Sequence, residues 1–149
     1  MMLKRKIEQR LTEWKNTPNK KPLIIKGCRQ CGKTFSVLEF AKRNYTHVVY
    51  LNFFENPDYT SVFAGSLEID NIIMMLSALL GKSAVFVPGE TVIVLDEIQD
   101  CPEARTALKF FRIDGKGIPQ FSQSVQWNAL FLVTPPHLCV GCPLAALAR

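Results

Sequence analysis

Long apolar runs are missing from this sequence, and so is the apolar stretch of a signal peptide. A membrane-spanning helix needs about 20 predominantly apolar residues, and no run in the 149-residue chain approaches that length. The basic start, Met1 to Lys6, is followed by Ile7-Glu8-Gln9-Arg10, where a signal peptide would need apolar residues. We therefore expect a cytoplasmic protein without a membrane partner.

The cysteines do not form the even set that a secreted disulfide framework requires. There are five, an odd number that favours a reducing compartment. Two Cys-x-x-Cys pairs, Cys28 with Cys31 and Cys139 with Cys142, are much farther apart than the roughly 15 to 20 residues typical of a zinc ribbon. A structural zinc site is therefore not expected.

Charge is scarce in the last part of the chain, where Arg149 is the only charged residue from Gly117 onward. The formal net charge of +5 is modest, and much of it lies before the first apolar run, between Lys4 and Lys21. A basic segment can bind nucleic acid, but this one lacks the interleaved series of aromatic residues that a stacking platform needs. A solvated helix face is the favoured interpretation, with nucleic-acid binding as the weaker alternative.

The stretch from Gly27 to Thr34, GCRQCGKT, fits the pattern G-x-x-x-x-G-K-S/T of phosphate-binding loops. The apolar run Leu23–Lys26 before it predicts a buried strand. Residues 35–42 after it contain no Gly or Pro and predict a helix. The succession of strand, loop and helix is the context that this motif requires.

The chemistry of such a loop predicts a site for ATP and Mg²⁺. Backbone N–H groups and the positive end of the following helix dipole converge on the phosphates. Lys33 would reach the β- and γ-phosphates, and the Thr34 hydroxyl would ligate Mg²⁺. The residues expected to bind the nucleotide are Gly27, Cys28, Arg29, Gln30, Cys31, Gly32, Lys33, Thr34 and Phe35.

The other predicted elements alternate between strands and helices. A helical period of apolar residues starts at Leu3 and predicts a helix over 2–15, and a second helix is expected over 67–80, with Met74 and Met75 as core filler. Strands are expected over 47–53 and 91–95, and a further helix opens at Cys101-Pro102-Glu103. The alternation predicts an α/β protein with a mostly parallel sheet covered on both faces.

Two acids directly follow the apolar strand 91–95. Ligands of an open α/β sheet lie beyond the carboxyl ends of the strands, so Asp96 should arrive at the same edge as the phosphate loop. Its carboxylate could hold Mg²⁺, directly or through water. Glu97 is placed to deprotonate a water that attacks the γ-phosphate, so Glu97 and Lys33 are the predicted catalytic residues.

With both motifs placed, the chain resembles a family of prokaryotic AAA-type ATP-binding proteins that typically carry a C-terminal domain of uncertain function. The similarity extends from Leu3 to Gly115 and is carried by KPLIIKGCRQCGKT at 21–34, VVYLNF at 48–53 and VLDEIQDCP at 94–102. The resemblance implies a P-loop NTPase fold with three layers, ATP binding and ATP hydrolysis. The ATP-binding domain is expected at residues 1–115.

Residues 116–149 depart from the family pattern. AAA relatives usually continue into a strand with a polar γ-phosphate sensor, and a helical lid and a trans-acting arginine are common. In the favoured interpretation this chain has no segment that corresponds to that strand, lid or arginine. Residues 116–149 are then a disordered or out-of-frame tail, and the fold is incomplete at its C-terminus. In the alternative, Ala129–Val133 is the missing strand and Thr134 the sensor.

Two function classes therefore stay open. The favoured one is an ATP-binding, Mg²⁺-dependent module that hydrolyses ATP, with an unknown protein partner. The other is a nucleotide-binding fragment or interaction module without turnover, because the C-terminal elements are missing. The oligomeric state is not predicted.

Overall fold

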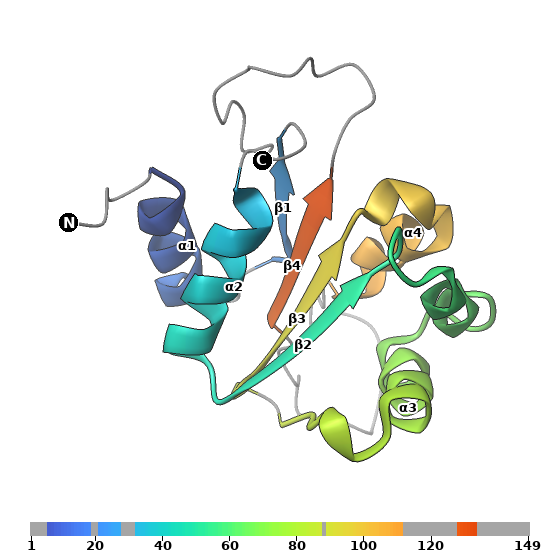
Figure 1. Ribbon diagram of the computed structural model, residues 1–149. Coiled ribbons are helices and arrows are strands. Elements are labelled where there is room, and N and C mark those ends of the chain that lie inside the picture. The colour runs from blue at the N-terminus through green and yellow to red at the C-terminus, as the bar shows by residue number, and fades with distance from the viewer. Residues whose placement is uncertain (1–5, 19–20, 28–31, 88, 112–127, 134–149) are drawn as a thin grey trace.

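Four parallel strands between two layers of helices make up the part of the chain that the computed structural model describes, residues 6–18, 21–27, 32–87, 89–111 and 128–133 (Figure 1). The strands are β1 (Leu23–Lys26), β2 (His47–Asn52), β3 (Thr91–Asp96) and β4 (Asn128–Val133). The α-helices are α1 (Lys6–Asn16), α2 (Lys33–Asn44), α3 (Ile69–Leu80) and α4 (Pro102–Phe111). Short 3₁₀ helices are η1 (Pro57–Phe63), η2 (Gly81–Ser83) and η3 (Ile98–Asp100).

The strand order in the sheet is β1-β4-β3-β2, and every neighbouring pair is parallel. In the register, Asn52 at the end of β2 lies opposite Asp96 at the end of β3. Parallel strands bring their carboxyl ends to one edge, which is where ligands of such sheets bind. The predicted α/β fold with a parallel sheet is confirmed.

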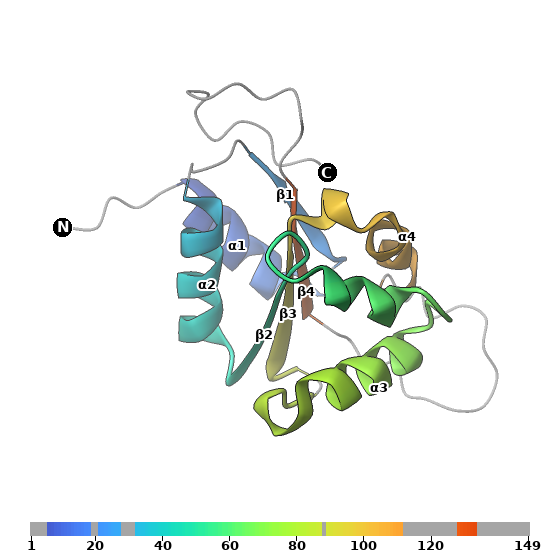
Figure 2. The ribbon, with the colours of Figure 1, turned by 45° about the vertical axis from the view of Figure 1, so that its right-hand side comes forward.

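The two faces of the sheet bury separate cores because successive side chains of a strand point to opposite faces. On one side, Val92 and Val94 of β3 pack with buried residues of α1 and α2. On the other, Ile93 and Leu95 pack with residues of η1, α3 and α4. Figure 2 shows the sheet edge-on between the α1–α2 layer and the α3–α4 layer. Every residue of β3 is buried, as expected for a strand covered on both faces.

The helix and strand boundaries follow the expected ones within a few residues. α2 starts at Lys33, two residues before the predicted start. Gly32 just before it takes the left-handed conformation (φ 77°), which a glycine accepts easily. α1 ends at Asn16 and is described from Lys6, so the predicted start at residue 2 lies outside the described residues. Among the described helices, none is long and apolar enough to cross a membrane.

β4 is the main departure from the favoured prediction. That prediction placed no sheet strand in 116–149, yet residues 128–133 of this segment form a strand between β1 and β3. Ala129, Leu130 and Leu132 are buried on its two faces. The alternative expectation of a strand at Ala129–Val133 therefore describes the sheet better, because an apolar run of this length suits a fully buried strand. Its sensor, Thr134, lies outside the described residues, and the division at residues 115 and 116 stays a prediction.

The two methionines of α3 were predicted wrongly as core filler. Met74 is 61% exposed and Met75 37% exposed. The buried stripe of the helix is formed by Ile72 and Leu76, which are four residues apart and lie on the same face. Met74 follows Ile72 by about 200° around the helix, so it points away from the core.

Tyr45, which follows α2, gives a test of the packing. The residue is 8% exposed, and its hydroxyl has no hydrogen-bond partner among the described residues. Tyr45→Phe should therefore raise the free energy of unfolding by about 1 kcal/mol or more, because it removes an unsatisfied buried hydroxyl. Urea denaturation at pH 7 measures this change, and a loss of stability would show that the hydroxyl is satisfied.

The same variant has a predictable pH dependence. Burial raises the pKa of Tyr45 from 10.0 to about 12. Between these values the unfolded chain has released the proton and the folded chain has kept it, so the wild-type protein loses stability as the pH rises from 10 to 12. The phenylalanine variant lacks this loss, and its advantage over the wild type should grow across that range.

Candidate nucleotide site

The phosphate-loop motif lies between β1 and α2, at the edge of the sheet where the strands end. Gly27 directly follows β1 and is buried. Gly32 precedes α2, and its carbonyl oxygen accepts the helix hydrogen bond from the Ser36 N–H (3.0 Å). Lys33 opens the helix and is only 4% exposed. Residues 28–31, which complete the predicted set, lie outside the described residues.

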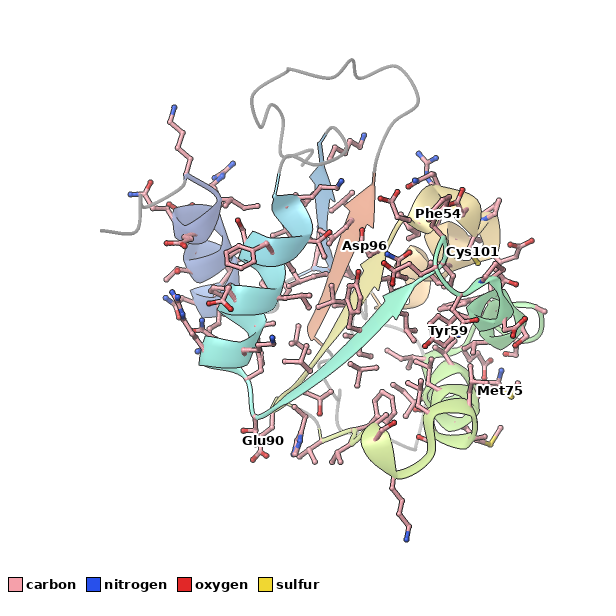
Figure 3. All side chains as sticks on the ribbon, viewed as in Figure 1. Phe54, Tyr59, Met75, Glu90, Asp96 and Cys101 are labelled. Atoms are coloured by element: carbon pink, nitrogen blue, oxygen red, sulfur yellow. The ribbon has the colours of Figure 1, made fainter. Side chains whose placement is uncertain are left out.

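Asp96 meets this motif directly. It is the last residue of β3, 2% exposed, and lies at the arrowhead end of that strand in Figure 3. Its Oδ2 atom accepts a hydrogen bond from the Thr34 hydroxyl at 2.7 Å, across 62 positions of sequence. Its Oδ1 atom accepts another from the Glu97 backbone N–H at 2.8 Å. Two motifs recognised separately in the sequence thus converge on one carboxylate.

Sequence reasoning missed two residues of this site, Tyr50 and Asn52 of β2. The Tyr50 hydroxyl donates to Asp96 Oδ2 at 2.9 Å, and Asn52 Nδ2 donates to the Tyr50 hydroxyl oxygen at 3.2 Å. The available signal was their spacing of two, which puts both side chains on one face at the carboxyl end of the strand. Polar residues there are unexpected in a buried parallel strand.

The Tyr50 hydroxyl is a hydrogen-bond donor at neutral pH. Burial raises its pKa well above the ordinary value, and the hydrogen bond to Asp96 and that residue's negative charge raise it further. The hydrogen bond from Asn52 lowers it, but the sum is a clear increase. The hydroxyl therefore keeps its proton, which is the proton shared with Asp96.

Glu97 stands out by its backbone. With φ 54° it is the only non-glycine residue of positive φ among those described, a conformation that costs on the order of 1 kcal/mol or more for such a residue. Its half-buried side chain accepts a hydrogen bond from Gln99 Nε2. The left-handed turn ends β3 abruptly, so that Glu97 precedes η3 at the sheet edge.

A comparison with protein families matches residues 19–125 to the model of the AAA domain. This segment is well over half of the chain and includes both motifs. The chain belongs to the AAA domain family. A comparison with curated proteins finds no match. The resemblance to AAA-type P-loop proteins is thereby confirmed, and the chain is a nucleotide-binding module of AAA type.

The donor atoms of this AAA domain suit a magnesium ion held together with a nucleotide. Mg²⁺ prefers oxygen ligands and usually takes one or two carboxylates plus substrate phosphates rather than a complete protein cage. Thr34 and Asp96 offer a hydroxyl and a carboxylate 2.7 Å apart. No group of three or more His, Cys, Asp or Glu residues that could hold a metal by itself occurs in the described ranges. The hydroxyl of Thr34 and the carboxylate of Asp96 therefore fit the protein's share of such a magnesium site.

Proposed function

We propose that this AAA domain binds ATP together with Mg²⁺ and hydrolyses it. The observation that supports this most is the contact between Thr34 and Asp96, because it joins the phosphate loop to the acidic end of β3. In P-loop proteins a hydroxyl and a carboxylate in these places serve the metal.

The binding roles follow from position. Residues Gly27 to Phe35 would surround the phosphates, with backbone N–H groups of the loop and of the first turn of α2 pointing at the anion. Lys33, which is buried at the start of that helix, would hold the β- and γ-phosphates. Thr34 and Asp96 would hold Mg²⁺, which when bound neutralises charge that develops on the phosphate oxygens.

Glu97 would act as the general base. It directly follows Asp96, so its carboxylate lies one residue beyond the proposed metal ligand. The hydrogen bond from Gln99 restricts the rotation of that carboxylate, and a carboxylate in a fixed position is what a general base requires. Proton removal by a positioned carboxylate contributes typically about 10²- to 10⁴-fold to a rate.

The proposal is tested by measuring nucleotide affinity beside phosphate release. A fluorescent ATP analogue should bind more tightly with Mg²⁺ than with EDTA, and the wild-type chain should release phosphate. Lys33→Ala should weaken binding by about 10- to 100-fold, since hydrogen bonds to charged groups contribute about 1.5–3 kcal/mol. The exposed Lys42 of the same helix supplies the matched control, Lys42→Ala, which should bind as the wild type does.

The outcomes separate the candidate functions. Absence of Mg²⁺-dependent binding would contradict the proposal as a whole. Binding without any phosphate release would contradict hydrolysis and identify a nucleotide-binding module without turnover.

A further inference from the structure

We propose that Tyr50 is a positioning residue for the metal, and that its hydroxyl, oriented by Asn52, holds the Asp96 carboxylate in the orientation that Mg²⁺ requires. The inference rests on the proposed function of the site. The two sequence motifs put the site residues on the phosphate loop, α2 and β3. The inference adds residues of a further strand, β2, to them. Tyr50 would act through Asp96 and would not contact the metal or the nucleotide itself.

The direction of every hydrogen bond in this network is fixed, starting from Asn52. Its Oδ1 atom accepts hydrogen bonds from the backbone N–H groups of Phe54 (2.9 Å) and Glu55 (3.1 Å). Backbone N–H groups can only donate, so this atom is the amide oxygen and the opposite atom is the NH₂ group. Asn52 Nδ2 must therefore donate to the Tyr50 hydroxyl oxygen.

Tyr50 has a single proton to give, and it goes to Asp96. Because its oxygen already accepts from Asn52 at 3.2 Å, the hydroxyl proton is directed at Asp96 Oδ2, 2.9 Å away. A chain of donors thus runs from the turn after β2 through Asn52 and Tyr50 to the carboxylate. The turn itself carries Phe54 beyond the end of β2 (Figure 3).

The lone pairs of Asp96 show what this bond does. An ionised carboxylate has about four lone-pair positions. On Oδ2, the Thr34 and Tyr50 hydroxyls take both. On Oδ1, the Glu97 N–H takes one, and the remaining one accepts no hydrogen bond from the described residues. That position is the one left for Mg²⁺ or for a water bound to it.

Loss of the Tyr50 hydroxyl would free one position on Oδ2. The carboxylate could then turn about its Cβ–Cγ bond, and Oδ1 would no longer be held toward the metal. Groups that orient a metal ligand by hydrogen bonds commonly change metal affinity by about 10- to 100-fold when they are removed. Asp96 is almost fully buried, so water cannot easily replace the missing donor.

The test is a MgCl₂ titration of the affinity for a fluorescent ATP analogue, with Tyr50→Phe against the wild type. The Mg²⁺ concentration at the midpoint should rise by about 10-fold or more in the variant. Affinity in EDTA should stay close to that of the wild type, because Tyr50 acts on the site only through Asp96. Tyr45→Phe is the matched control, because it also removes a buried tyrosine hydroxyl. Tyr45 lies at the C-terminal end of α2, whereas Thr34 lies at the N-terminal end, so the midpoint of this variant should equal that of the wild type.

Thermal melting would show whether Tyr50→Phe folds, and a second variant tests the inference if it does not. Asn52→Ala releases the Tyr50 hydroxyl without deleting it and should shift the midpoint in the same direction. An unchanged midpoint in the folded variants would overturn the inference, and so would a lower one, which would show that Tyr50 competes with the metal for Asp96. If the wild type itself shows no response to Mg²⁺, the proposed function fails rather than the role of Tyr50.

Discussion

Replacing Glu97 with glutamine should lower phosphate release by about 10²- to 10⁴-fold and leave ATP affinity close to that of the wild type. The amide has the shape of the carboxylate but cannot accept a proton from water. The backbone constraint at this position (φ 54°) applies equally to both residues, so the turn after β3 should be kept. A change in turnover would therefore report the chemistry of the side chain rather than a local rearrangement.

Single-turnover phosphate release with saturating ATP and Mg²⁺ measures this effect. Asp100→Asn is a suitable control because it neutralises an exposed acid of the adjacent η3 helix and should release phosphate at the wild-type rate. Equal rates for Glu97→Gln and the wild type would remove Glu97 from the mechanism and leave a different base to be found.

Asp96→Asn should remove the Mg²⁺ dependence of ATP binding almost entirely, a loss of about 100-fold or more in affinity measured with Mg²⁺. Removing one member of a buried, hydrogen-bonded charge pair commonly costs about 2–5 kcal/mol in binding. The affinity in EDTA should change little, because the backbone and Lys33 contacts to the phosphates do not involve Asp96.

Asp96→Asn has to be checked for folding, since the side chain accepts three hydrogen bonds in a buried position. Thermal melting without nucleotide gives that control. A folded variant that still binds more tightly with Mg²⁺ than with EDTA would show that the metal lies elsewhere.

Much of the fold was predictable because its signals are local. The apolar runs of β1 and β3 are short-range patterns, and each matches a strand of the structure. The sheet edge at which Thr34 meets Asp96 also follows from sequence, since the carboxyl ends of parallel strands share one edge. The catalytic and nucleotide-binding roles of these residues stay predictions.

Other features depend on tertiary placement. Tyr50 and Asn52 become site residues only because β2 lies beside β3 in the register that sets Asn52 opposite Asp96. In the sequence, β4 is a run of apolar residues within a tail of unusual composition. It is a strand of the sheet because it lies between β1 and β3, which sequence reasoning did not establish. Met74 was assigned to the core from its apolar character alone, although the packing of α3 turns it outward.

The most direct test of the account is a double-mutant cycle of Thr34→Ala and Asp96→Asn, read as the gain in ATP affinity on adding Mg²⁺. If the two residues hold one metal, the double variant should lose scarcely more of this Mg²⁺-dependent gain than Asp96→Asn loses alone. The coupling free energy between the two substitutions should then be at least about 1 kcal/mol, within the range seen for residues in contact. Thr34→Ser, which keeps the hydroxyl, should behave as the wild type. Additive losses, within about 0.5 kcal/mol, would contradict a shared metal site at this edge of the sheet.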